Sequence, residues 1–158
     1  MPIVEVAGWP GSGKTSYLVE LAKSNPNYTI FIDCEGSLAS RSSAGFPHTC
    51  DLYRIHTIHE FVALLHQQRL SKPNTLVCID GIAHLFKGSN LSAMHTTKII
   101  SQLMLTLHKL TYQFQLQIFL TNTIVSKGDG NIVSSLGPVF ARYFDQHIQI
   151  GRQLHSSL

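Results

Sequence analysis

Apolar stretches that end in polar or turn-forming residues recur along the chain and predict a series of short strands. The stretch at residues 75–80 is almost continuously apolar before its final aspartate, as a parallel strand covered on both faces requires. Five further stretches are rich in β-branched, aliphatic or aromatic residues and fit the strand pattern: 3–7, 28–33, 52–55, 116–121 and 147–150. The chain therefore predicts a sheet that is largely buried.

Longer segments between these stretches repeat their apolar side chains at helical spacing. Helices are predicted at residues 14–24, from residue 57 to about 71, and from about 91 to 113. Thr57 and Glu60 have the spacing of a capping box, which marks a helix N-terminus. Strands that alternate with helices favour an α/β fold with a mostly parallel sheet, in one domain spanning residues 1–158.

Polar residues at the ends of these strands are the first sign of a functional site. In a parallel α/β sheet, ligands bind at the carboxyl ends of the strands. Asp33, Glu35 and Asp80 lie at or just past such ends, which predicts a metal and phosphate site there. Residues 36–48 and 126–131 are rich in small polar residues and glycine, and we expect them to be loops near this edge.

Composition narrows the class of protein. Only 13% of the 158 residues are charged, and the net charge of +3 comes without any basic run, so no basic tail indicates nucleic-acid binding. The three cysteines form no C-x-x-C pair, which predicts reduced thiols in an intracellular protein. We find no signal peptide and no apolar run long enough to span a bilayer, so we expect neither secretion nor membrane insertion.

Residues 8–15 read GWPGSGKT and fit the G-x-x-x-x-G-K-[ST] pattern of a P-loop, between a predicted strand and a predicted helix. The glycines let backbone N–H groups turn toward phosphate, and the helix N-terminus adds partial positive charge. Lys14 would contact the β- and γ-phosphates of ATP, and the Thr15 hydroxyl would hold Mg²⁺. The residues expected to bind the nucleotide in this loop are Gly8, Gly11, Ser12, Gly13, Lys14, Thr15 and Ser16.

Two carboxylates are candidates for the chemistry beside this loop. Asp80 ends the strand at residues 75–80 in the Walker B manner and would orient Mg²⁺; the alternative is an aspartate that caps a turn. Glu35 follows the strand at residues 28–33. If that strand lies next to the P-loop strand, Glu35 faces the γ-phosphate and acts as general base; the alternative is an exposed loop glutamate.

These motifs together resemble those of RecA/RadA-type recombinases. The segment FIDCEG at residues 31–36 resembles the one that carries their catalytic glutamate, and VCIDG at residues 77–81 resembles their Walker B strand. The segment LTNT at residues 120–123 resembles the strand end that carries their γ-phosphate sensor. The resemblance covers nearly the whole chain, and a small paralogue of the eukaryotic strand-exchange recombinase, of the Shu-complex type, is the nearest comparison.

The resemblance implies further site residues. Asn122 or Thr123 would sense the γ-phosphate, although the family has glutamine where this chain has Thr123. Lys87 and Lys127 lie in the two segments that face DNA in that family, and their glycine, serine and asparagine neighbours suit phosphate contacts; ordinary surface loops are the alternative. Gly81 stands where the family usually has serine.

The expected function is that of an ATP-binding accessory factor in DNA repair by homologous recombination. It would assemble with a recombinase or a paralogue on single-stranded DNA, hydrolyse ATP weakly with Glu35 and Lys14 as catalytic residues, and act in the nucleus if the chain is eukaryotic and otherwise in the cytoplasm. Two alternatives remain: an ATP-binding scaffold with little turnover, and a small-molecule phosphotransferase. The latter would need an arginine-rich lid, for which residues 36–50 offer only Arg41.

Overall fold

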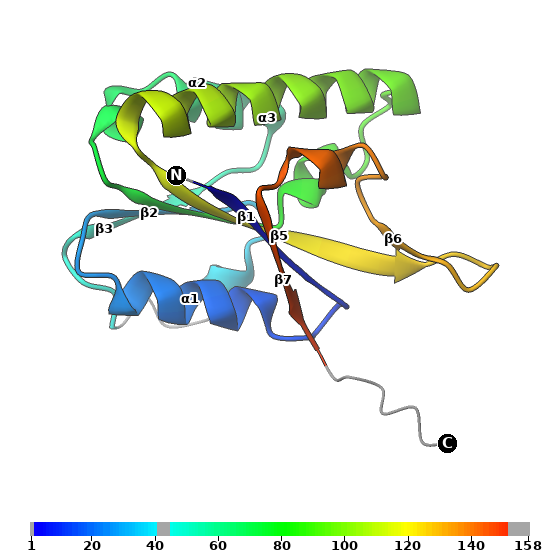
Figure 1. Cartoon of the computed structure of the whole chain (residues 1–158), viewed down its shortest axis with the longest axis horizontal. Helices are drawn as coiled ribbons and strands as arrows, with labels where there is room; N and C mark the ends of the chain where they lie inside the picture. The colour runs from blue at the N-terminus through cyan, green and yellow to red at the C-terminus, as the bar shows by residue number, and fades with distance from the viewer. Residues whose placement is uncertain (1, 41–44, 152–158) are drawn as a thin grey trace.

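Six parallel strands and one antiparallel strand form a single sheet in the computed structural model, which describes residues 2–40 and 45–151. The order across the parallel part is β3-β2-β4-β5-β1-β7, and β6 pairs with the far end of β5 in the antiparallel sense (Figure 1). The strands are β1 (Ile3–Gly8), β2 (Thr29–Asp33), β3 (Cys50–Arg54), β4 (Leu76–Asp80), β5 (Gln117–Ser126), β6 (Ile132–Ser134) and β7 (Gln146–Ile150). The predicted α/β class and mostly parallel sheet are confirmed.

Helices cover both faces of this sheet, with α1 (Lys14–Ser24) on one side and α2 (Ile58–Leu65) and α3 (Ala93–Phe114) on the other (Figure 1). The connection from β1 to β2 and the connection from β4 to β5 run in opposite directions along the sheet. Right-handed crossovers therefore place α1 and α3 on opposite faces. All strand carboxyl ends of the parallel part consequently meet at one edge, beside the start of α1.

Side chains that alternate along the strands build a core on each face. On β2, Ile30 and Ile32 belong to the core under α2 and α3, whereas Phe31 belongs to the core under α1. All three side chains are fully buried, as the near-continuous apolar pattern of an inner parallel strand predicts. The core under α1 consists of Val4, Val6, Leu18, Val19, Ala22, Phe31, Leu76, Cys78 and Phe119.

The predicted start of the second helix is confirmed in detail. The Thr57 hydroxyl accepts a hydrogen bond from the backbone N–H of Glu60 at 3.2 Å, and the Glu60 carboxylate accepts one from the Thr57 N–H at 3.2 Å. These two bonds satisfy N–H groups that the first turn of a helix leaves unpaired. The long third helix begins two residues later than predicted, at Ala93, because Ser92 caps it by accepting from the His95 N–H.

The carboxyl-terminal third differs most from the predicted elements. The strand predicted to end at residue 121 continues to Ser126, because its outer half pairs with β6 in a hairpin. The predicted loop at residues 126–131 forms the turn of this hairpin. The chain after β4 forms a 3₁₀ turn, Ile82–Phe86, and Phe140–Tyr143 forms another around the buried Phe140.

The three cysteines are free thiols, as predicted. Burial raises the pKa of the Cys34 and Cys78 thiols, and burial together with Asp51 raises the pKa of Cys50 to about 11. No helix in the described part of the chain is long and apolar enough to cross a bilayer. Arg41, the arginine available for a lid, lies outside the described residues.

Candidate nucleotide-binding site

The P-loop connects β1 to α1 and wraps one side of a cavity of about 430 Å³. Gly11 and Gly13 have φ angles of 74° and 98°, in the left-handed region that favours glycine. No atom lies within 4 Å of the position that a Cβ would take at either residue, so the conformation rather than crowding requires glycine there. Ser12 closes the turn by donating its backbone N–H to the Trp9 carbonyl at 3.1 Å.

The start of α1 leaves a suitable place for an anion. Its N-cap residue is Gly13, which provides no side-chain oxygen to cap the first amide groups of the helix. Lys14 donates from its Nζ to the carbonyls of Gly8 at 3.0 Å and Trp9 at 2.8 Å, and so remains at the rim of the loop. Burial lowers the pKa of the Lys14 ammonium, while Glu35 and Asp80 oppose this shift. A phosphate here would meet backbone amides, a helix N-terminus and an ammonium group.

Asp80 lies opposite the loop and is 1% exposed. Its Oδ2 accepts hydrogen bonds from the Thr15 hydroxyl at 2.7 Å and the Ser37 hydroxyl at 3.0 Å, and its Oδ1 accepts one from Thr121 at 2.8 Å. Three hydroxyl donors explain how a carboxylate is tolerated at this depth. The two residues predicted to hold Mg²⁺, Thr15 and Asp80, are thus in direct contact.

Oxygen ligands in this arrangement fit Mg²⁺, which commonly takes one or two protein ligands and completes its shell with phosphate and water. Within residues 2–40 and 45–151, no group of three or more histidine, cysteine, aspartate or glutamate side chains could hold a metal ion. A magnesium ion here would therefore depend on the hydroxyl of Thr15, the carboxylate of Asp80 and the nucleotide itself.

Glu35 also lines this cavity, but not for the reason expected from the sequence. Two strands, β4 and β5, separate β2 from β1, so the assumption that Glu35 follows a neighbour of the P-loop strand is wrong. Glu35 reaches the cavity because the turn after β4 makes room for it. Gly81 has a φ of 75°, and a Cβ there would lie 2.7 Å from the Glu35 Cβ.

Asp33 has a structural position in place of the expected one in the site. Its carboxylate accepts hydrogen bonds from three backbone N–H groups, those of Glu35 at 3.2 Å, Gly36 at 2.7 Å and Leu38 at 3.1 Å. Asp33 is 3% exposed and does not line the cavity. It holds the backbone that carries Glu35.

The two candidate phosphate sensors point in different directions, as consecutive residues of a strand must. Thr123 lines the nucleotide cavity. Asn122 is buried and donates from its Nδ2 to the Glu5 carboxylate at 2.5 Å and to the Ser134 hydroxyl at 2.9 Å. The structure therefore brings Thr123 to the P-loop, and places Asn122 in a separate buried network.

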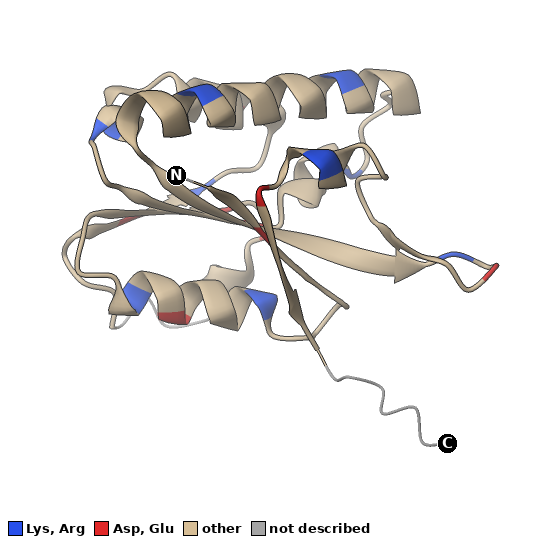
Figure 2. Ribbon diagram, in the orientation of Figure 1, with Lys and Arg blue, Asp and Glu red and all other residues tan. Residues whose placement is uncertain are grey.

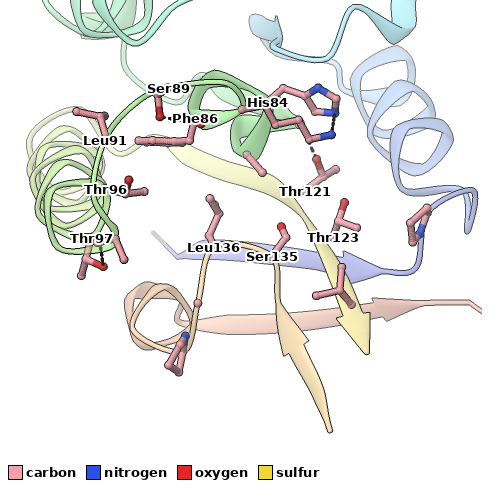
Figure 3. A pocket seen from close by; sticks show the side chains of 18 residues that line it. His84, Phe86, Ser89, Leu91, Thr96, Thr97, Thr121, Thr123, Ser135 and Leu136 are labelled. Atoms are coloured by element: carbon pink, nitrogen blue, oxygen red, sulfur yellow. Dashed lines mark hydrogen bonds between the residues drawn. The ribbon is translucent and has the colours of Figure 1, made fainter. Parts of the chain in front are cut away.

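A second hollow of about 700 Å³ adjoins the nucleotide cavity. It lies between the start of α3, the 3₁₀ turn Ile82–Phe86 and the base of the β5–β6 hairpin, and we call it the groove (Figure 3). Both hollows share the same four lining residues, Pro10, His84, Lys87 and Thr123. No aspartate or glutamate of the described chain lines the groove. Lys127 lies farther out, exposed on the hairpin turn.

Three side chains of the site were not among the residues predicted from the sequence: Ser37, Thr121 and His84. Ser37 and Thr121 donate to Asp80, and His84 lies 3.2 Å from the Glu35 carboxylate. Thr121 ends the predicted strand at residues 116–121, so its position at the carboxyl edge is a signal that the sequence contains. Ser37 and His84 lie in turns whose course no local pattern indicates.

Comparison with known proteins supports the fold. No protein-family model matches the chain, and no curated protein matches it in sequence. Among solved structures, the ATPase domain of a RecA-like replicative helicase is similar, with a TM-score of 0.66 and 14% sequence identity over 96% of this chain and 69% of that one. In all, 115 chains of solved structures match, so the fold is widespread and does not itself select a function. The expected RecA-like ATPase fold class is confirmed.

Proposed function

We propose that this protein binds ATP with Mg²⁺ at the P-loop and acts as a recombinase-type accessory factor on single-stranded DNA, together with a recombinase or paralogue partner. The observation that carries the nucleotide part is the contact between Thr15 and Asp80 at 2.7 Å, inside a cavity that Lys14 and Glu35 also line. This set contains a phosphate-binding ammonium, two magnesium ligands and a carboxylate able to accept a proton from water.

Trp9 offers a direct test of nucleotide binding, because it is the only tryptophan of the chain and lies in the P-loop, 37% exposed. We expect its fluorescence to change on titration with ATP and Mg²⁺, with calorimetry giving the affinity. Lys14→Ala should weaken binding by about 1.5–3 kcal/mol through loss of a charge-assisted contact. Lys109→Ala, an exposed lysine of α3, is the matched control and should bind normally. Equal affinity in both variants would reject the site.

The groove supports the nucleic-acid part of the proposal. Its wall combines hydroxyl groups of Thr96, Thr123 and Ser135 with the ammonium of Lys87, and no carboxylate of the described chain opposes them (Figure 3). Such a surface suits a sugar-phosphate backbone more than a base-specific contact. The charge is small, since Asp129 accompanies Lys127 on the hairpin turn (Figure 2). A single copy should therefore bind weakly, and repeated copies or a partner should add contacts by effective concentration.

Fluorescence anisotropy of labelled oligothymidylate across a salt series tests this part. Each phosphate contact on a single strand contributes about −0.7 to the log–log salt slope. We expect a slope of about −1.4 for a chain that uses Lys87 and Lys127, and a nearly flat line after both are changed to alanine. ATP affinity should be unaffected by that double change. Absence of binding with every nucleotide and with the partner would reject the DNA role.

A scaffold with little turnover is the second candidate, favoured by Thr123. Its short hydroxyl side chain lines the cavity where the resembling recombinases carry glutamine, so it reaches less far toward a γ-phosphate. Measured phosphate release separates the two functions: a scaffold binds ATP tightly and releases phosphate no faster than a Glu35→Gln variant. Transfer of the γ-phosphate to an added nucleoside or sugar, in place of water, would instead identify a phosphotransferase.

A further inference from the structure

His84 lies between the proposed catalytic base and the proposed DNA-contacting lysine. The 3₁₀ turn after β4 folds back so that the His84 N–H donates to the Gly81 carbonyl at 2.9 Å. This turn brings the imidazole Nε2 to 3.2 Å from the Glu35 Oε1 and 3.4 Å from the Lys87 Nζ. The imidazole stands at the boundary between the nucleotide cavity and the groove and lines both (Figure 3).

One nitrogen cannot serve both neighbours at once. To interact with the carboxylate of Glu35, Nε2 must carry a hydrogen and donate it. To interact with the ammonium of Lys87, the same Nε2 must instead present its lone pair. A neutral imidazole meets these demands in two different tautomers, with the hydrogen on Nε2 or on Nδ1. Glu35 and Lys87 therefore compete for the protonation state of one atom.

We propose that His84 is a positioning residue that couples Lys87 to Glu35. This inference rests on the proposed function. A phosphate group in the groove attracts the Lys87 ammonium and removes it from His84. The Nε2–H tautomer then prevails, and its hydrogen bond holds Oε1 of Glu35 in one orientation. The other carboxylate oxygen, Oε2, is left to accept the proton of an attacking water. Occupation of the groove would in this way prepare the nucleotide cavity for hydrolysis.

Nitrogen-15 NMR of the histidine side chains tests the competition without nucleotide, DNA or turnover. At about pH 8, above the ordinary histidine pKa, chemical shifts of Nδ1 and Nε2 report the tautomer. The His84 signals are assigned by their loss in His84→Gln. Lys87→Met should move the equilibrium toward the Nε2–H tautomer, and Glu35→Ala should move it toward Nδ1–H. Lys109→Met serves as the control and should change nothing. An unchanged His84 tautomer in both test variants would overturn the proposal.

Oligothymidylate then tests the coupling from the groove. In the unmodified protein it should shift His84 toward the Nε2–H tautomer, and in Lys87→Met it should produce no further shift. An oligonucleotide that binds by anisotropy yet leaves the tautomer unchanged would overturn the coupling. An oligonucleotide that does not bind at all counts against the proposed DNA function, and the variants of the previous experiment still decide the role of His84.

Turnover provides the third measurement. His84→Ala should lower the DNA-stimulated rate of phosphate release about tenfold with an unchanged KM for ATP, because only the orientation of Glu35 is lost. His84→Gln retains a side-chain N–H and an acceptor oxygen, so it should keep most of the stimulation. Equal loss in both variants would indicate a purely structural histidine and contradict the proposal.

Discussion

Thr15 and Asp80 are 65 residues apart in the chain, yet the Thr15 hydroxyl donates a 2.7 Å hydrogen bond to the Asp80 carboxylate. One residue opens α1 and the other ends β4, so their contact exists only in the folded sheet. The bond joins the two oxygen ligands expected for Mg²⁺ and holds them at the mouth of the P-loop. A magnesium ion would take the place of the hydroxyl hydrogen between them.

Asp80→Asn should therefore make nucleotide affinity insensitive to magnesium. The change keeps the size of the side chain and removes its charge, so ATP affinity with Mg²⁺ should fall by about 1.5–3 kcal/mol, roughly tenfold or more. Affinity in excess chelator should change little, since no metal is then bound. Calorimetric titrations in both conditions measure the difference. If Asp80→Asn retained the full magnesium effect, the ion would have other ligands.

Glu35→Gln should separate binding from hydrolysis. The amide has the size of the carboxylate but cannot accept a proton from water, so phosphate release should fall about 10²–10⁴-fold. ATP affinity should be retained, because the expected phosphate and magnesium contacts come from the P-loop and Asp80. Glu20→Gln, on the exposed side of α1, is the matched control. Equal rates for Glu35→Gln and the unmodified protein would place the base elsewhere.

Gly81→Ala should reduce stability and displace Glu35. Its φ of 75° costs a non-glycine residue about 1–2 kcal/mol, and the added Cβ would also lie 2.7 Å from the Glu35 Cβ. Gly88 has a φ of 73° with no atom within 4 Å of a Cβ, so Gly88→Ala carries the conformational cost alone. Denaturant unfolding should show a larger loss for Gly81→Ala. Identical losses would mean that the Glu35 backbone moves freely.

Nucleotide affinity should decrease as pH rises in the alkaline range. Burial lowers the pKa of Lys14 below 10.5, so the free protein loses this positive charge at a lower pH than an exposed lysine would. Phosphate favours the charged form, and binding in this range should therefore take up a proton. Calorimetry in two buffers of different ionisation enthalpy measures that uptake. Lys14→Ala should abolish it, and an affinity that increased with pH would contradict the assignment.

Local sequence determined the features that were predicted well. The P-loop and the Thr57 cap depend on residues within a few positions of each other, and the buried strands depend on their own apolar runs. Strand order depends on how far each crossover travels, which no local pattern states. The sequence could therefore place Asp80 and Glu35 at strand ends but could not show that β4 and β5 separate β2 from β1.

The finer errors have the same origin. Strand alternation requires Asn122 and Thr123 to face opposite ways, but only the position of Glu5 on the neighbouring β1 shows which one is turned from the cavity. The contact of His84 with Glu35 depends on a turn made possible by Gly81. Both relationships join elements from distant parts of the chain, so neither could be inferred from spacing.

The position of β1 in the sheet has a consequence for the order of folding. Among the described strands, β1 pairs only with β5 and β7, which lie in the carboxyl-terminal part of the chain. At synthesis rates of about 5–20 residues per second, the P-loop strand leaves the ribosome about 5–20 s before Gln117. β2, β3 and β4 can pair with one another during that interval, while β1 waits without a neighbour. The first motif to be translated is thus among the last to assemble, and nucleotide can bind only to a chain whose final strands are in place.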